Sequence, residues 1–342
     1  MGMAGLILVF TGLLLPAGSQ LSAEISGPLQ EKMKVFVSIL PQAYFAERVG
    51  GDRVDVSVMV GPGQSPHTYE PGPKQMYELS QAKLYFRIGV DFEKVWMERI
   101  GRINPNMKVV DTRRGIQLLP MKTHHDHEEG YGQQEKGRRP QGHHARKQQD
   151  EHQGPNRHGT HGLDDQYHRE DRGPYRPHGE GLKDPHIWLS LRLVKIQAET
   201  MYEALATEDP AHRAYYLENL KAFDRDLDKL DREIAQSLKK AKSRKFIVFH
   251  PAWGYLARDY GLEQTPIEIE GKEPTAKDLI RIIEEAKAEG IGIIFVQKQF
   301  SKTSAETVAR AIGGKVVHID PLARDYLKNM KAIADRFAGV LK

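Results

Sequence analysis

The chain has 342 residues, is 39% hydrophobic, carries a formal net charge of +4 and contains no cysteine. This length is sufficient for two domains, each with its own core. The absence of cysteine excludes a fold held together by disulfides. Its 50 Lys and Arg residues are interspersed with 46 Asp and Glu residues, whereas a nucleic-acid-binding protein gathers its basic residues on one element. We therefore expect no nucleic-acid partner.

The N-terminus resembles a secretory signal peptide. An apolar run from Ala4 to Leu15 precedes Pro16 and several small residues, and Ala23 is a suitable last residue before cleavage. The run is short for a membrane span, although the missing Lys or Arg ahead of it leaves an uncleaved anchor as the alternative. Residues 1–23 are thus expected to be a signal peptide, and the mature protein is expected to be soluble in the periplasm.

The segment 34–121 alternates β-branched apolar runs with stretches of helical period, which predicts an N-terminal α/β lobe. The expected strands are Val35–Leu40, Val54–Val60, Leu84–Ile88 and Lys108–Val110. The expected helices between them lie around Ala43–Val49, Lys74–Gln81 and Phe92–Ile100.

Residues 122–183 have a different composition. The part from 122 to 181 holds ten of the fifteen histidines and ten glycines, and it has no Val, Ile, Phe, Met or Trp. Such a segment cannot build a core, so we predict a disordered histidine-rich loop. It opens with the stretch KTHHDHEEG, in which imidazoles and carboxylates, both metal ligands, lie side by side.

Two helices are expected next. The first, within 184–208, covers about Ile187–Leu205 and completes the N-terminal lobe. The second, within 209–242, has Asp209 as N-cap and Pro210 at its first turn. Its apolar residues step by three and four from Tyr216 to Leu238, which predicts one buried stripe. At 1.5 Å per residue this helix is about 45 Å long, enough to link and brace two lobes.

A second α/β series fills 245–342. Its expected strands are Phe246–Phe249, Pro266–Ile269, Ile291–Val296 and Val316–Ile319. Its expected helices lie near Tyr255 and at Lys277–Ala288, Ala305–Ile312 and Arg324–Leu341. Strands that alternate with helices predict a parallel sheet with right-handed crossovers. The fold class is therefore α/β, with one parallel four-stranded sheet in each lobe.

Four side chains stand where open α/β sheets bind ligands, beyond the carboxyl ends of strands. His67 follows the second strand, His250 ends the fifth and Asp320 ends the last, while His186 starts the helix after the histidine-rich loop. Each residue alone is better explained as a helix cap or a hydrogen-bonded loop residue than as a metal ligand. The set as a whole indicates ligands from both lobes converging on one cleft.

From about Lys34 onward the sequence resembles the metal-binding cluster of ABC-transporter solute-binding proteins, in particular the zinc-binding ZnuA type. The stretches that carry the resemblance are SPHTYEPGPKQMYELSQAKLYFRIGVDFE, DPHIWLSL, VFHPAWGYLARDYGL and IDPLARDY. The resemblance implies two Rossmann-like lobes joined by a long helix and a metal ion at the cleft between them. It also implies a monomer that delivers the ion to a membrane permease.

By this resemblance His67, His186 and His250 are the metal ligands and Asp320 is the fourth, with Glu70 or water as substitutes. One departure is Ser190 after Trp188 and Leu189, where the family often has Leu-Asp-Pro. Three imidazoles and one carboxylate favour Zn²⁺ over Mn²⁺, which prefers oxygen ligands, so zinc is the expected cargo.

Other functions remain open at this point. The alternatives are a manganese or iron carrier, a metal-binding adhesin of the same fold, and a zinc hydrolase with an open coordination position. The chain has no HExxH, GxSxG or Walker A motif, which disfavours an enzyme. For a zinc carrier, the histidine-rich loop next to His186 is hypothesised to hold extra Zn²⁺ weakly and raise its concentration at the cleft; a solvated insertion is the alternative.

Overall fold

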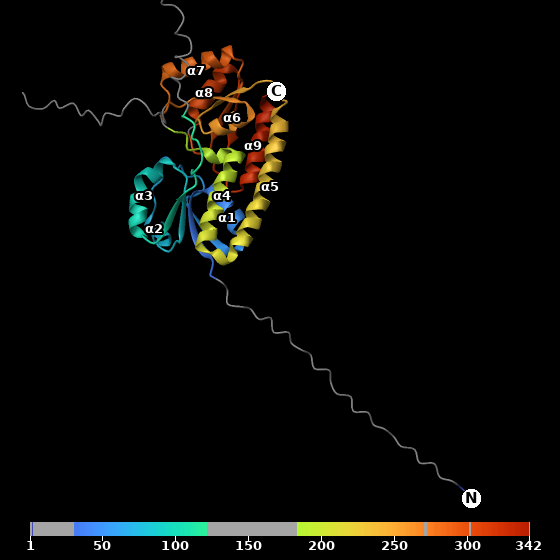
Figure 1. Ribbon diagram of the computed structural model, residues 1–342. Coiled ribbons are helices and arrows are strands. Elements are labelled where there is room, and N and C mark those ends of the chain that lie inside the picture. Colours follow the sequence, from blue (N-terminus) through green and yellow to red (C-terminus); the bar gives the residue numbers. More distant parts are fainter. Residues whose placement is uncertain (1, 3–30, 122–182, 270–271, 301, 342) are drawn as a thin grey trace, which may run out of the picture.

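The computed structural model describes residues 2, 31–121, 183–269, 272–300 and 302–341 (Figure 1). The predicted signal peptide and the predicted histidine-rich loop lie outside these residues, apart from Gly2 and Lys183. Within the described part, no helix is both long enough and apolar enough to cross a membrane.

The N-terminal lobe is built on a parallel sheet in the order β2-β1-β3-β4. Its strands are β1 (Met33–Ile39), β2 (Val54–Val60), β3 (Leu84–Arg87) and β4 (Lys108–Asp111). The helices between them are α1 (Leu40–Gly50), α2 (Pro73–Leu79) and α3 (Asp91–Ile103). The carboxyl ends of all four strands therefore lie at one edge of the sheet.

The C-terminal lobe repeats this arrangement with a parallel sheet in the order β6-β5-β7-β8. Its strands are β5 (Lys245–Val248), β6 (Glu263–Pro266), β7 (Ile293–Gln297) and β8 (Lys315–Ile319). Its helices are α6 (Gly254–Tyr260), α7 (Ala276–Ala288), α8 (Thr303–Ile312) and α9 (Tyr326–Val340). The prediction of two parallel four-stranded sheets is confirmed.

Strand β6 differs from the prediction, which placed it at Pro266–Ile269. The strand ends at Pro266, and the chain bends at Ile267 and Glu268. The backbone N–H groups of these two residues still donate to Val248 and Phe249 at the end of β5. The alternating apolar pattern that suggested a longer strand reflects the burial of Ile267, which lies beyond the end of β6.

The two central helices also start later than predicted. A 3-10 turn, Ile187–Leu189, precedes α4 (Leu191–Glu208), because the Ser190 side chain caps α4 by accepting from the N–H of Leu193. A second 3-10 turn, Pro210–His212, precedes α5 (Arg213–Leu238). Asp209 does not cap this turn; its carboxylate accepts from Tyr216 and pairs with the ring of His212.

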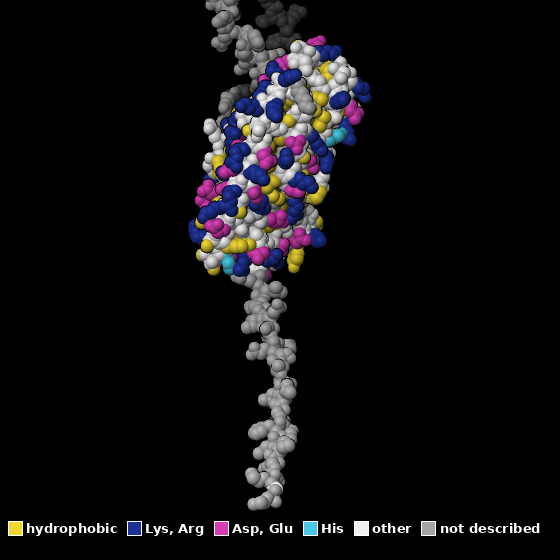
Figure 2. Space-filling model, turned by 90° about the vertical axis from the view of Figure 1, so that its right-hand side faces the viewer, with side chains coloured by type: hydrophobic (Ala, Val, Ile, Leu, Met, Phe, Trp, Pro, Cys, Tyr) yellow, Lys and Arg dark blue, Asp and Glu magenta, His cyan; other side chains and the backbone are white. Residues whose placement is uncertain are grey.

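Helix α5 runs along both lobes and packs against α1 and α4 of the first and α9 of the second (Figure 1). Its predicted apolar stripe is buried, namely Tyr216, Leu220, Phe223, Leu227, Leu230, Ile234 and Leu238. These side chains belong to one hydrophobic cluster that extends from β1 to α9. On the outside, seen from the α5 and α9 side, basic and acidic side chains are interspersed (Figure 2). The long helix thus joins the lobes through a continuous core.

Candidate metal centre

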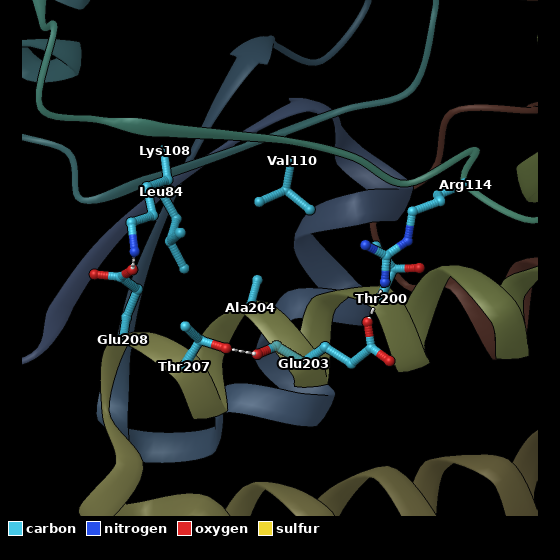
Figure 3. A pocket seen from close by; sticks show the side chains of 9 residues that line it. All are labelled: Leu84, Lys108, Val110, Arg114, Thr200, Glu203, Ala204, Thr207 and Glu208. Atoms are coloured by element: carbon cyan, nitrogen blue, oxygen red, sulfur yellow. Dashed lines mark hydrogen bonds and ion pairs between the residues drawn. The ribbon is translucent and has the colours of Figure 1, made fainter.

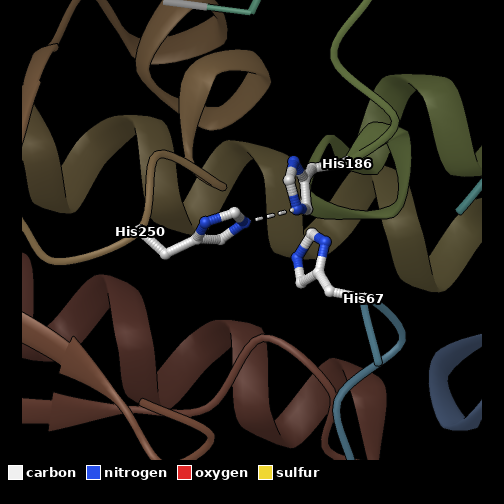
Figure 4. A group of neighbouring side chains, drawn as sticks. All are labelled: His67, His186 and His250. Atoms are coloured by element: carbon white, nitrogen blue, oxygen red, sulfur yellow. Dashed lines mark hydrogen bonds between the residues drawn. The ribbon is translucent and has the colours of Figure 1, made fainter. Parts of the chain in front are cut away.

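Three histidines from distant parts of the chain meet between the lobes (Figure 4). His67 lies in the loop between β2 and α2, His186 precedes the turn before α4, and His250 follows β5. One ring nitrogen of each lies within 4.8 Å of the others, and these residues form the group of potential metal ligands found in the described part of the chain. His186 and His250 are buried, and the His67 side chain is 28% exposed.

Each of the three imidazoles is held by a carboxylate. The Nδ1 atoms of His67, His186 and His250 lie 2.6, 2.7 and 2.6 Å from oxygens of Asp91, Asp184 and Glu268, respectively. An ionised carboxylate only accepts hydrogen bonds, so each Nδ1 carries the proton and donates it. In the neutral imidazole the Nε2 atom then carries a lone pair, which is the form that binds a metal ion.

The geometry of two of these Nε2 atoms favours a cation. They belong to His186 and His250 and lie 3.1 Å apart. A tetrahedral Zn²⁺ with nitrogen ligands at about 2.0–2.1 Å separates them by roughly 3.3 Å. Two lone pairs this close repel each other, so either a proton on one ring or a metal ion lies between them. The spacing of the pair therefore suits a metal ion that replaces the proton.

Burial lowers the pKa of His250 to about 4, even though its bond to Glu268 acts in the opposite direction. This imidazole is therefore neutral at physiological pH. The ring of Phe300 stacks on it, with centroids 4.8 Å apart and an angle of 20° between the planes. At the more exposed His67, the hydrogen bond to Asp91 holds the pKa of that carboxyl far below its usual value. The His250 side of the site is thus buried, and the His67 side is partly exposed.

His186 is fixed by contacts with the C-terminal lobe, although it leads into a helix of the N-terminal lobe. The hydroxyl of Tyr255 donates to the backbone oxygen of Asp184 at 2.8 Å. The indole N–H of Trp188 donates to the backbone oxygen of Pro321. The hydroxyl of Tyr326 donates to the backbone oxygen of Trp188. These bonds hold His186 beside His250.

Asp320, the predicted fourth ligand, is not in the histidine group. Its carboxylate accepts from the N–H of Leu322 at 2.9 Å and lies 3.6 Å from the amine of Lys298. It lines a separate groove of about 750 Å³. Glu70, the predicted substitute, is exposed in the His67 loop. The identity of the fourth ligand therefore stays a prediction.

Sequence reasoning missed the three carboxylates. Asp91 begins α3 just beyond β3, and Glu268 lies just beyond β6. Both positions are carboxyl ends of parallel strands, the same signal that identified His67 and His250. Asp184 stands two residues before His186. These positions were available in the sequence, but which side chain reaches which ring depends on loop conformations.

A pocket of about 220 Å³ lies elsewhere, between β4 and α4 (Figure 3). Its lining contains Lys108 and Arg114, which form ion pairs with Glu208 and Glu203. No histidine lines it, and its charges are paired. We assign it no part in metal binding.

Comparison with known proteins agrees with the geometry. The family model described as "Zinc-uptake complex component A periplasmic" matches residues 35–340. The Bacillus subtilis protein named "High-affinity zinc uptake system protein ZnuA" is 26% identical over 85% of this chain and 79% of its own. A crystal structure of ZnuA is 39% identical, covers 91% of this chain and 100% of its own, and has a TM-score of 0.74. A zinc-bound deletion mutant of ZnuA has a TM-score of 0.72 at the same identity and covers 91% of this chain and 99% of its own.

Proposed function

Because the chain belongs to the ZnuA family of zinc-binding components of ABC import systems, we propose that His67, His186 and His250 capture Zn²⁺ for delivery to a membrane permease. The observation that carries this proposal is the convergence of one nitrogen from each of three imidazole rings, every one of which has its Nδ1 atom bound to a carboxylate. Asp320, Glu70 or water fills the fourth position, and the protein acts as a periplasmic monomer.

The donor set favours Zn²⁺ over Mn²⁺ as the bound metal. Three imidazole nitrogens suit the four-coordinate geometry of Zn²⁺, whereas Mn²⁺ favours more oxygen ligands. The family is one of uptake components, which supports a solute-binding protein over the adhesin and hydrolase alternatives.

The test is metal analysis and zinc titration of the full chain against a chromophoric chelator. The wild-type protein is expected to hold one tight Zn²⁺, and a variant with alanine at His67, His186 and His250 is expected to lose it. Weak extra sites elsewhere do not compete with the chelator and are not counted. The matched control is His318→Ala, because His318 is exposed on β8 and does not belong to the group of three histidines.

Transport is tested in zinc-starved cells that lack the native binding protein. The wild-type chain is expected to restore ⁶⁵Zn uptake, as is His318→Ala, while the triple variant is expected not to. Retention of the tight site by the triple variant would overturn the ligand assignment, and uptake with that variant would overturn the transport role.

A further inference from the structure

The three carboxylates that hold the histidines differ in their surroundings. The Asp91 side chain is 42% exposed and forms an ion pair with Lys94 at 2.7 Å. The side chains of Asp184 and Glu268 are 3% and 5% exposed, and within the described residues the ion-pair partner of each is its own histidine. Asp91 is thus neutralised by a lysine in water, whereas the other two are buried.

A bond to a neutral imidazole satisfies a carboxylate oxygen but leaves its negative charge in place. A buried charge without a counter-charge is costly. Asp184 and Glu268 together bring two such charges to His186 and His250, whose Nε2 atoms lie 3.1 Å apart. The two carboxylate charges are balanced by an ion of charge +2.

We propose that Asp184 and Glu268 are positioning residues that set the charge specificity of the site, making it select divalent over monovalent cations. This inference rests on the proposed zinc site. Each carboxylate orients its imidazole through Nδ1 and supplies one negative charge to the ion held at Nε2. Asp91 orients His67 in the same way but contributes less charge, since Lys94 offsets it.

Glu268→Gln separates the two roles. The amide oxygen still accepts the proton of His250 Nδ1, so the ring keeps its orientation while the charge is removed. Changes to partners of this kind lower metal affinity by about 10- to 100-fold. Because the Coulomb energy scales with the charge of the ion, the loss for Zn²⁺ on a logarithmic scale is twice that for a monovalent ion. A 100-fold loss for Zn²⁺ thus corresponds to about 10-fold for Ag⁺.

The experiment compares wild type, Glu268→Gln, Asp184→Asn and the matched control Asp91→Asn, all in the full chain. Affinities for Zn²⁺ and Ag⁺ are measured by competition with chelators, and melting temperatures are recorded with and without zinc. Glu268→Gln and Asp184→Asn are expected to lower the affinity ratio of Zn²⁺ to Ag⁺. Both are also expected to raise the melting temperature of the zinc-free protein, because they remove a buried charge. Asp91→Asn is expected to change the ratio less.

A structural role alone would give a different result. Such a role predicts equal losses of affinity for Zn²⁺ and Ag⁺, and a lower melting temperature of the zinc-free variants or their failure to fold. Any of these outcomes overturns the proposal. An Asp91→Asn effect as large as that of Glu268→Gln overturns it as well. Absence of tight zinc binding by the wild type would instead overturn the proposed function.

Discussion

At the residue scale, the site depends on rings whose orientation and protonation are set by their surroundings. His250 is buried, and its pKa of about 4 lies below the ordinary value of 6.5. Between these pH values the unfolded chain binds a proton at His250 that the folded protein does not, so the free energy of unfolding rises with pH. The contribution is fully present above pH 6.5 and is lost as the pH falls towards 4.

We therefore predict that the zinc-free protein loses roughly 3 kcal/mol of stability through His250 over this interval. Denaturant unfolding between pH 4.5 and 7 measures it, with His250→Gln as the comparison. The variant is expected to show the shallower dependence on pH, since the carboxylates titrate in both proteins. Parallel curves for the two proteins would contradict the assignment.

Part of the histidine group was predictable from sequence, because positions just beyond the carboxyl ends of parallel strands lie at one edge of their sheet, as His250 does after β5. His67 lies in the longer loop between β2 and α2, and His186 precedes the turn before α4. Their meeting with His250 depends on how the two lobes face each other. The partners Asp91, Asp184 and Glu268 were not predicted, since a hydrogen bond at 2.6 or 2.7 Å depends on loop geometry. The placement of Asp320 beside Lys298 has the same origin.

At the element scale, helix α5 follows directly from its sequence pattern. All seven residues of the predicted stripe are buried, and Phe223 at its centre contacts the rings of Tyr44 and Phe45 in α1. Periodicity identifies such a face because burial needs only the right spacing. Helix starts were less predictable, since Ser190 and Asp209 both suit a cap by composition but only Ser190 makes the bond.

Phe223→Ala is predicted to destabilise the protein by about 3–5 kcal/mol, because removing the ring leaves a cavity in the core where α5 packs against α1. Urea unfolding measures the change. The control on the same helix is Gln236→Ala, an exposed position where a change within about 0.5 kcal/mol is expected. A small effect of Phe223→Ala would mean that α5 does not brace the first lobe through this contact.

At the scale of the whole molecule, the lobes are not independent bodies. One hydrophobic cluster contains residues of β1, α5 and α9, and Trp188 is bonded both to the backbone of Pro321 and to Tyr326. These contacts between the lobes were not predictable from local patterns, because each joins residues more than 130 positions apart.

The continuous core predicts one cooperative unfolding transition for the zinc-free protein. Calorimetry is expected to give equal calorimetric and van't Hoff enthalpies, and saturating zinc is expected to move the single transition to higher temperature. Two separate transitions, of which zinc moves one, would show that the lobes unfold separately.

The bridge between Pro120 and Lys183 brings together the two points at which the histidine-rich segment leaves and rejoins the fold. The bond from the N–H of Asp184 to the oxygen of Leu119 reinforces this stem. Insertions or deletions between these points alter no connection among the strands and helices of either lobe. The length and histidine content of this segment can therefore differ while the strands and helices that position His67, His186 and His250 stay as they are.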